Sequence, residues 1–207
     1  YLQLTVKRRA QKVKARGRQP RRLKHELCAK LEARLPFELT TDQRSVLQEI
    51  RKDLESTAPM ARLLQGDVGC GKTLVAFLGA LLVVGDGGQA AIMAPTELLA
   101  RQHAESAAGL LEPLGIRVAL LSGSVKQEPR RQLLRALKDG EVDIVIGTHA
   151  LFSADVVFRE LALVVVDEQH RFGVLQRMAL VAKGASPETP PPDLLLIALC
   201  AGKPKKS

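Results

Sequence analysis

A glycine-rich stretch, "GDVGCGKT" at residues 66–73, carries the residue types needed to bind a chain of phosphates. It fits the pattern G-x-x-x-x-G-K-[ST], in which the glycines let successive backbone N–H groups point inward toward an anion. The Lys72 ammonium can reach the β and γ phosphates, and the Thr73 hydroxyl can bind Mg²⁺. The stretch therefore predicts a site for ATP and Mg²⁺, formed by Gly66, Asp67, Val68, Gly69, Cys70, Gly71, Lys72 and Thr73. A chance glycine-rich turn is the alternative.

A second segment, which ends in acidic residues, completes the chemistry that such a phosphate loop needs. The run "LALVVVDE" at residues 161–168 is apolar on both faces and ends in two carboxylates. Ligands of open α/β sheets collect where such buried strands end. Asp167 is placed to hold Mg²⁺ through water, and Glu168 to act as the general base that polarises an attacking water. An Asp-Glu pair alone is usually only solvated, and the phosphate loop in the same chain favours the catalytic interpretation.

The elements that must position these residues follow from alternating apolar runs and amphipathic stretches. Strand-like and helix-like segments alternate, which predicts an α/β fold: a mostly parallel sheet with helices on both faces and right-handed crossovers. The core must come from Val, Leu, Ile and Ala, because aromatic residues make up only 3% of the chain. The expected strands are 61–65, 90–94, 116–121, 142–147, 161–166 and 193–199, and the expected helices between them are 72–84, 97–111 and 126–138.

Two further helices are expected before the first of these strands. Residues 21–35 place Leu23, Leu27, Leu31 and Leu35 four apart, so one face of a helix there is apolar and the rest is charged. The pair at Thr40 and Thr41 offers an N-cap for the second helix. Its buried side is expected to carry Val46, Leu47, Ile50 and Leu54. We therefore expect residues 1–35 to form a basic helical arm or connector.

The net charge of +9 is concentrated in that arm. Residues 1–24 hold ten basic residues and no acidic one, while the remaining 21 basic and 22 acidic residues nearly balance. Such an arm suits a polyphosphate partner such as nucleic acid, and a solvated linker without a partner is the alternative.

Several classes of protein are excluded by what the sequence lacks. The three cysteines, Cys28, Cys70 and Cys200, are too few and too scattered for a disulfide framework or a zinc site. No apolar stretch approaches the roughly 18 residues that a membrane span needs, so no membrane association is expected. A reducing compartment, the cytoplasm, is the expected location. An organellar transit peptide is the alternative, because transit peptides are also Arg-rich and acid-poor.

Taken together, the segments "DVGCGKT", "APTELLARQH", "GTHAL" and "DEQHRFGV" resemble the first motor lobe of superfamily 2 helicases, and most closely the RecG branch-migration helicases. The resemblance covers about residues 35–184 and implies a RecA-like lobe that binds ATP and tracks branched or forked DNA. Transcription-repair coupling translocases share "GTH" and "HRFGV" but typically carry a second Glu where this chain has Gln169. The Gln favours the RecG type, and the translocase lobe remains the alternative.

The resemblance also implies roles that the residues alone leave open. "LPFELTTDQ" at residues 35–43 is similar to the family's adenine-recognising segment, in which Gln43 reads the base edge and Phe37 packs beside it. Gln169 and His170 are similar to residues that sense the γ-phosphate and pass its presence to the DNA side. Two segments that follow predicted strands resemble those that hold the DNA backbone without reading sequence: Pro95, Thr96 and Glu97, and Gly147, Thr148 and His149.

The sequence departs from the family at its carboxyl-terminal end. Relatives follow the strand at 193–199 with Thr-Ala-Thr, whereas this chain has Ala198, Leu199 and Cys200. The second motor lobe, whose arginines complete ATP hydrolysis, would begin where this chain stops, so an isolated lobe is expected to bind ATP but hydrolyse it poorly. The start at Tyr1 likewise suggests a fragment. We expect a connector at 1–35, a RecA-like lobe at 36–199 and a basic tail at 200–207.

Two hypotheses from other classes also fit a phosphate loop. One is a small kinase or generic nucleotide hydrolase, which would need an acceptor-binding lid and would have no use for "APTELLARQH" or "GTHAL". The other is a non-catalytic protein that binds nucleotide in the lobe and nucleic acid through the arm.

Overall fold

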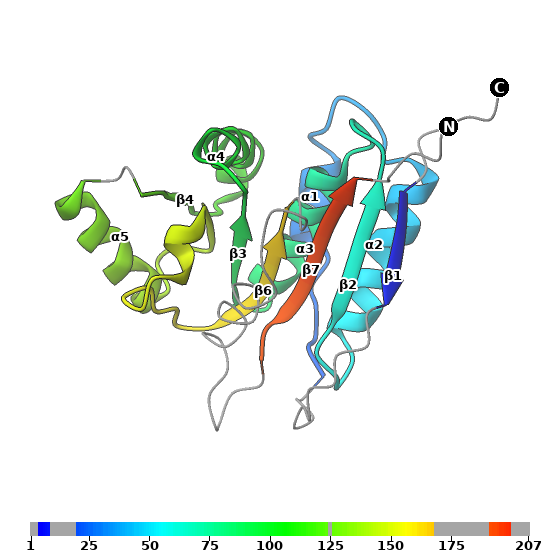
Figure 1. Cartoon of the computed structure of the whole chain (residues 1–207). Coiled ribbons are helices and arrows are strands. Elements are labelled where there is room, and N and C mark those ends of the chain that lie inside the picture. Colours follow the sequence, from blue (N-terminus) through cyan, green and yellow to red (C-terminus); the bar gives the residue numbers. More distant parts are fainter. Residues whose placement is uncertain (1–3, 9–19, 124–125, 168–190, 200–207) are drawn as a thin grey trace.

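The structure is a computed structural model that describes residues 4–8, 20–123, 126–167 and 191–199 (Figure 1). Its strands are β1 (Leu4–Arg8), β2 (Ala61–Gly66), β3 (Gln89–Met93), β4 (Val118–Leu121), β5 (Ile144–Gly147), β6 (Leu161–Val166) and β7 (Asp193–Leu199). Its α-helices are α1 (Glu26–Glu32), α2 (Thr41–Leu54), α3 (Lys72–Val84), α4 (Glu97–Leu111) and α5 (Gln127–Asp139). Two short 3₁₀ helices, η1 (Glu112–Leu114) and η2 (His149–Phe152), follow α4 and β5.

The strands form one seven-stranded sheet in the order β1-β2-β7-β6-β3-β5-β4. Every pairing from β2 to β4 is parallel, and only β1 runs antiparallel to its neighbour. All six strands expected from the sequence are present, as are the three helices expected between them. The α/β class with a mostly parallel sheet is therefore confirmed. Because the six parallel strands share one direction, their carboxyl ends meet at the upper edge of the sheet in Figure 1.

The prediction of a helical arm is wrong for residues 4–8, which form the edge strand β1. It pairs with the whole of β2, from Leu4 opposite Gly66 to Arg8 opposite Arg62. Without β1, the outer edge of β2 would present a row of unpaired backbone groups, and the β-branched pair Thr5 and Val6 suits a strand. Pairing with a distant segment thus outweighs the local pattern. The expected arm residues 9–19 and tail residues 200–207 lie outside the described part of the chain.

The helix expected at 21–35 is also shorter than expected, since α1 begins only at Glu26. Residues 20–25 are irregular, and Arg21 forms ion pairs of 3.9 Å with both Asp86 and the fully buried Asp193. Leu23 is nevertheless buried, as the leucine pattern predicted. Burial raises the pKa of the Cys28 thiol on α1 to about 12, so this cysteine is a neutral core residue.

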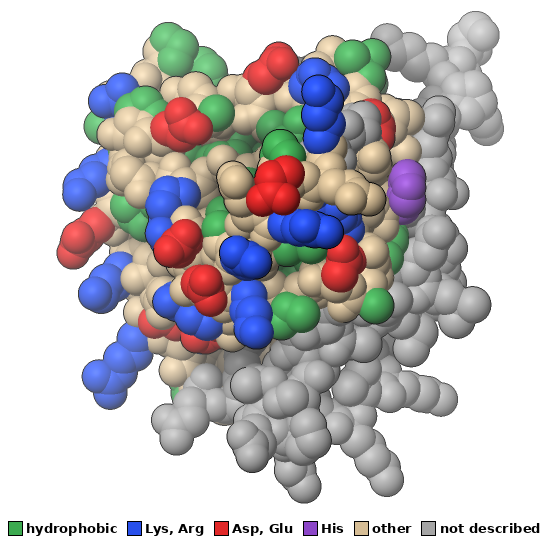
Figure 2. Space-filling model, turned by 90° about the vertical axis from the view of Figure 1, so that its left-hand side faces the viewer, with side chains coloured by type: hydrophobic (Ala, Val, Ile, Leu, Met, Phe, Trp, Pro, Cys, Tyr) green, Lys and Arg blue, Asp and Glu red, His purple; other side chains and the backbone are tan. Residues whose placement is uncertain are grey.

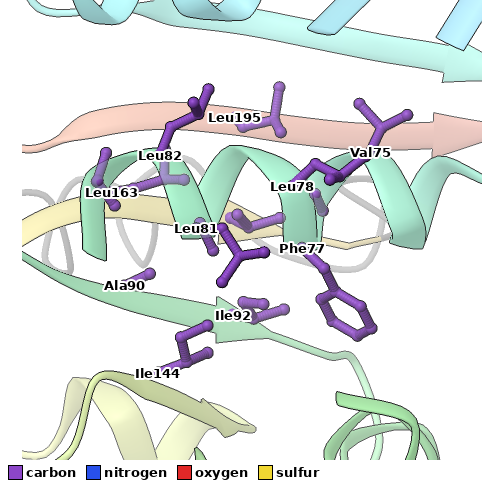
Figure 3. Close-up of a cluster of buried hydrophobic side chains, with 14 of the residues drawn as sticks. Val75, Phe77, Leu78, Leu81, Leu82, Ala90, Ile92, Ile144, Leu163 and Leu195 are labelled. Atoms are coloured by element: carbon purple, nitrogen blue, oxygen red, sulfur yellow. The ribbon is translucent and has the colours of Figure 1, made fainter. Parts of the chain in front are cut away.

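The centre of the core is α3, whose nine consecutive residues from Val75 to Val83 are all buried. A helix that is apolar all round must be enclosed, and α3 packs between the sheet on one side and α1 and α2 on the other. Figure 3 shows Leu78, Leu81 and Leu82 of α3 among strand residues such as Leu163 and Leu195. Among the described residues, no helix combines the length and the apolar character that a membrane crossing requires.

The two faces of the sheet carry separate apolar clusters. One cluster joins α1, α2, α3 and α4 to strand residues such as Ile92 and Val165, and the other joins α5 and η2 to their alternate neighbours such as Met93 and Val166. This alternation is what the two-residue period of a strand predicts. The outer face that α5 forms is turned toward the viewer in Figure 2, where acidic and basic side chains are intermixed. The net charge is therefore not gathered on this face.

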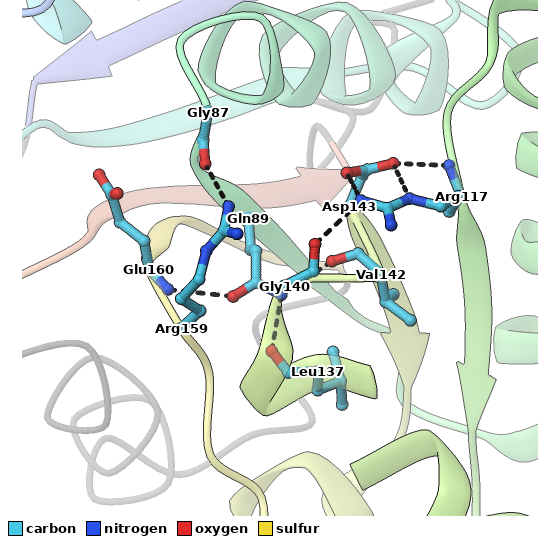
Figure 4. Close-up of polar contacts among 9 residues, drawn as sticks. All are labelled: Gly87, Gln89, Arg117, Leu137, Gly140, Val142, Asp143, Arg159 and Glu160. Atoms are coloured by element: carbon cyan, nitrogen blue, oxygen red, sulfur yellow. Dashed lines mark hydrogen bonds and ion pairs between the residues drawn. The ribbon is translucent and has the colours of Figure 1, made fainter. Parts of the chain in front are cut away.

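Gln89 ties together the amino-terminal edge of the sheet, far from the strand ends that carry the motifs (Figure 4). Its buried side-chain amide donates to the Leu137 and Val142 carbonyls at 2.9 and 2.8 Å. Its side-chain oxygen accepts from the Glu160 N–H at 3.0 Å. One side chain thus bonds three backbone groups, at the end of α5 and on the connections that lead into β5 and β6, although the Leu137 carbonyl also accepts from the Gly140 and Arg159 N–H groups.

Replacing Gln89 with Leu should lower the free energy of unfolding by about 2–4 kcal/mol, because the Val142 carbonyl and the Glu160 N–H lose this hydrogen-bond partner. Urea denaturation followed by circular dichroism measures the change. The matched control is Gln132→Leu on the exposed side of α5, which should stay within about 0.5 kcal/mol of the parent chain. Equal stability of the two variants would show that the Gln89 hydrogen bonds contribute nothing net.

Candidate nucleotide and nucleic-acid sites

The sheet order brings the phosphate loop and the acidic strand tip to the same edge. Strand β2 leads into the loop and β6 leads into Asp167, and only β7 lies between these two strands. Two strand spacings amount to about 10 Å. Gly66 lies opposite Leu199 on β7 and Val166 lies opposite Leu196, so β2 extends three residues, about 10 Å, further toward this edge than β6 does. This arrangement satisfies the first requirement of a shared nucleotide site.

The loop has the backbone geometry of an anion-binding turn. Gly69 and Gly71 have φ angles of +78° and +82°, a left-handed conformation that glycine adopts without strain. Gly71 is also the N-cap of α3, so the helix begins at the turn with its positive end toward the loop. A Cβ added at Gly71 would clash with the Gln43 amide nitrogen, which leaves glycine as the fitting residue there.

Lys72 is held against the loop itself. Its ammonium donates to the carbonyl oxygens of Gly66 and Asp67 at 2.8 and 2.6 Å. These neutral acceptors hold a cation over the turn, and phosphate oxygens, which are charged, would bind the same ammonium more strongly. The loop geometry and the position of the ammonium therefore both fit a nucleotide phosphate chain.

Asp167 is anchored at its backbone and at its side chain. Its N–H donates to the Met93 carbonyl at 2.8 Å, and its carboxylate oxygen Oδ2 lies 2.8 Å from Nε2 of His103 on α4. His103 and Thr73 line the same open cavity of about 550 Å³ between α3 and α4. Thr73, whose hydroxyl is predicted to hold Mg²⁺, and His103, which contacts the predicted carboxylate ligand, thus line one cavity, although Asp167 itself is not among its lining residues. No role for His103 was predicted from the sequence, although this residue ends the segment "APTELLARQH".

Gln43 makes two structural hydrogen bonds, and the contact with the phosphate loop was not predicted from the sequence. Its side-chain oxygen accepts from Thr40 N–H at 2.9 Å in a capping box that starts α2, as the predicted N-cap required. Its amide nitrogen donates to the Cys70 carbonyl in the phosphate loop at 3.0 Å. Gln43 therefore fixes the loop to α2. Reading of the adenine edge stays a prediction, which the remaining N–H and lone pair of this amide leave chemically feasible.

Phe37 lies apart from the Gln43 amide. Its ring is 55% exposed and lines a cavity of about 290 Å³ with Pro36, Leu39 and Arg44, among others. An exposed aromatic face beside a cavity can stack on a base, but this cavity does not include Gln43 among its lining residues. Joint recognition of adenine by the two residues stays a prediction.

The other half of the strand edge carries the segments predicted to hold DNA. Strands β3, β5 and β4 are neighbours, and Met93, Gly147 and Leu121 lie level with one another. The residues that follow them, Thr96 and His149 among them, therefore emerge side by side. The third strand end adds Ser122 and Gly123, which the sequence analysis missed. Their position directly after a predicted strand was the signal that could have identified them.

Backbone and side-chain groups at this edge suit a phosphate ligand. Thr96 caps α4 by accepting from the Leu99 N–H at 3.2 Å, which directs the positive end of the helix to this edge. His149 is exposed, whereas Thr148 is only 2% exposed and its hydroxyl has no hydrogen-bond partner among the described residues. A buried hydroxyl without a partner is costly, and a ligand oxygen would satisfy it. Contact with DNA stays a prediction for all six residues: Pro95, Thr96, Glu97, Gly147, Thr148 and His149.

Three predicted residues, Glu168, Gln169 and His170, lie outside the described part of the chain. Their roles as general base and phosphate sensors follow from the sequence and stay predictions. The end of β6 at Val166 fixes only where the chain enters this segment.

The family model that matches this chain, and two relatives with similar sequences, are all helicases. Residues 40–201 match the DEAD/DEAH box helicase family. The ATP-dependent DNA helicase RecG of Treponema pallidum is 58% identical over 174 residues, which are 83% of this chain and 25% of the relative. The RecG of Bacillus subtilis is 45% identical over 204 residues, which are 96% of this chain and 30% of the relative. The chain thus spans about a quarter of the curated relatives it matches.

A solved structure supports the same resemblance. The structure of RecG bound to a three-way DNA junction matches with a TM-score of 0.77 and 40% identity, covering 88% of this chain and 24% of that one. The resemblance to RecG helicases and the RecA-like fold expected from the motifs are confirmed.

Two glycine substitutions separate backbone strain from steric exclusion in the loop. Gly69→Ala and Gly71→Ala impose similar strain, because both positions have positive φ, but only Gly71 has a neighbour within 4 Å of an added Cβ. Gly71→Ala should therefore cost about 1–3 kcal/mol more in free energy of unfolding, as it displaces the Gln43 amide. Thermal unfolding of both variants measures this difference, and equal losses would contradict the contact between Gly71 and Gln43.

Proposed function

Because the chain belongs to the DEAD/DEAH box helicase family, we propose that it is the ATP-binding motor lobe of a RecG-type DNA helicase. Its substrate is branched or forked DNA, and its processes are branch migration, recombination and replication-fork repair in the bacterial cytoplasm. The observation that carries the proposal is the shared strand edge: the phosphate loop and Asp167 occupy one half, and the predicted DNA segments occupy the other half. The lobe spans residues 36–199, with a connector at 1–35 and a basic tail at 200–207.

In the nucleotide half, Lys72 binds the β and γ phosphates together with the loop N–H groups. Thr73 and Asp167 hold Mg²⁺, which when bound neutralises charge that develops on the phosphates. Glu168 acts as general base, and Gln169 and His170 respond to the γ-phosphate. Support comes from the position of the Lys72 ammonium and from the cavity that Thr73 and His103 share.

In the DNA half, the contacts go to the sugar-phosphate backbone rather than to base edges. The amino end of α4 and the Thr148 hydroxyl, for which the described residues offer no partner, supply donors for phosphate oxygens, and His149 is exposed. Such contacts carry no sequence information, which suits a motor that moves along DNA of any sequence. The match to RecG on a three-way junction supports a branched substrate.

The lobe alone binds ATP but turns it over slowly. In motors of this kind, arginines from a second lobe stabilise the charge on the transferring phosphate and contribute about 10³–10⁵ in rate. The matched relatives are about four times as long as the part this chain covers, so the complete catalytic assembly includes further segments.

ATP hydrolysis with and without forked DNA tests this assignment. We expect slow, DNA-insensitive turnover by the 207-residue chain, and DNA-stimulated turnover when the second lobe of a matched RecG is fused to it. Fusions that keep Ala198-Leu199-Cys200 or restore Thr-Ala-Thr show whether that departure limits the rate. Phosphorylation of a small acceptor would instead support a kinase, and nucleotide binding without turnover in every fusion would support a non-catalytic protein.

Replacing Lys72 with Ala should weaken binding of a non-hydrolysable ATP analogue by about two orders of magnitude, since charge-assisted hydrogen bonds contribute about 1.5–3 kcal/mol each. Titration of a fluorescent analogue measures this change. Lys52→Ala, on the exposed side of α2, is the matched control and should bind like the parent chain. Unchanged affinity in the Lys72 variant would place the nucleotide elsewhere.

A further inference from the structure

His103 occupies a place on α4 that faces the nucleotide half of the strand edge. The helix packs on the sheet through Ala100, Ala107 and Leu111, none of which is exposed. His103 follows Ala100 by three residues, so it lies on the border of the buried stripe. The small alanines let α4 approach the sheet closely, and the imidazole side chain is only 14% exposed. The ring is therefore enclosed by its surroundings and does not extend freely into solvent.

The hydrogen bond from His103 joins two different connections of the fold. Asp167 follows β6, whereas α4 follows β3, and the two side chains meet at 2.8 Å with 14% and 17% of their surface exposed. The Nε2–H donates and the carboxylate oxygen Oδ2 accepts. Because the Asp167 N–H is also held by Met93 at 2.8 Å, the residue is fixed at both its backbone and its side chain. Rotation of the carboxylate about χ1 and χ2 is consequently restricted.

The His103 imidazole also lines the cavity that residues near the amino end of α3 line. Thr73 lines this cavity with His103, and Leu74 and Phe77 of α3 line it as well. The predicted hydroxyl ligand of Mg²⁺ and the residue that orients the predicted carboxylate ligand thus lie on opposite helices around one space.

We propose that His103 is a positioning residue that holds the Asp167 carboxylate in the orientation needed to bind Mg²⁺ with the ATP phosphates. The proposal rests on the function proposed above and assigns a role to a residue outside the phosphate loop and the acidic strand tip. Ligands that are already oriented lose less conformational freedom when the metal binds. Removing a partner that orients a metal ligand typically weakens metal affinity about 10- to 100-fold.

Three substitutions test the donor that His103 supplies. His103→Leu removes the donor, His103→Asn keeps a polar group too short to reach Oδ2, and His103→Gln places an amide N–H near the position of Nε2. The readout is the affinity of each purified chain for a fluorescent non-hydrolysable ATP analogue, titrated against Mg²⁺ and repeated with EDTA. The matched control is His25→Leu, at an exposed position before α1 whose side chain makes no capping hydrogen bond.

We expect the Leu and Asn variants to need about 10- to 100-fold more Mg²⁺ for half-maximal binding, while their affinity in EDTA stays that of the parent chain. The Gln variant should recover most of the loss, and His25→Leu should not differ. Unchanged affinity in EDTA also shows that the variant is folded. If the Leu variant does not fold, the difference in Mg²⁺ requirement between the Asn and Gln variants tests the proposal.

An unchanged or lower Mg²⁺ requirement in the Leu and Asn variants overturns the proposal, and so does a Gln variant as impaired as Leu. These outcomes differ from a failure of the proposed function. In that case the parent chain itself binds the analogue with no dependence on Mg²⁺ or does not bind it at all.

Discussion

The parallel pairing of β2, β7, β6, β3, β5 and β4 is the constraint on which the rest of the structure depends. It brings six strand ends to one edge, where the proposed nucleotide site lies at β2 and β6 (the nucleotide half) and the proposed DNA segments lie at β3, β5 and β4 (the DNA half). The halves meet where β6 pairs with β3. Helix α4 begins in the DNA half at Thr96, and through His103 it contacts Asp167 in the nucleotide half. The two halves are therefore joined by a direct side-chain contact as well as by the sheet.

Much of this fold was predictable because local patterns and long-range packing agree. The apolar runs that form the parallel strands are buried on both faces, and α3 is apolar all round. In both cases the local sequence pattern is enough to predict the burial of the element. The capping box at Thr40 and Gln43 likewise marks its helix locally. Residues 4–8 were predicted wrongly because β1 is an edge strand that pairs with β2, and Arg21, in the expected helix at 21–35, instead forms ion pairs with Asp86 and Asp193. The partners, β2 for the first segment and Asp86 and Asp193 for Arg21, cannot be identified from the local sequence of either segment.

The same distinction applies to the sites. The phosphate loop and Asp167 are identified by contiguous motifs, whereas the roles of His103 and of the Gln43 amide depend on contacts between residues 64 and 27 positions apart. Such contacts cannot be read from spacing along the chain. The charge is a further case, since basic and acidic side chains are intermixed on the α5 face and the excess lies in residues 1–24. DNA contacts in the lobe are expected from helix ends, backbone N–H groups and hydroxyls, not from a basic surface.

The central claim is that a triphosphate and its metal bind between the turn at residues 66–73 and the tip of β6. Crystals of the chain grown with Mn²⁺ in place of Mg²⁺ and a non-hydrolysable ATP analogue test it directly, because anomalous scattering locates the metal without reference to the protein. We predict one metal peak between the Thr73 hydroxyl and the Asp167 carboxylate, with the phosphates against the loop N–H groups. A nucleotide bound elsewhere, or a metal that neither residue approaches, would contradict the account.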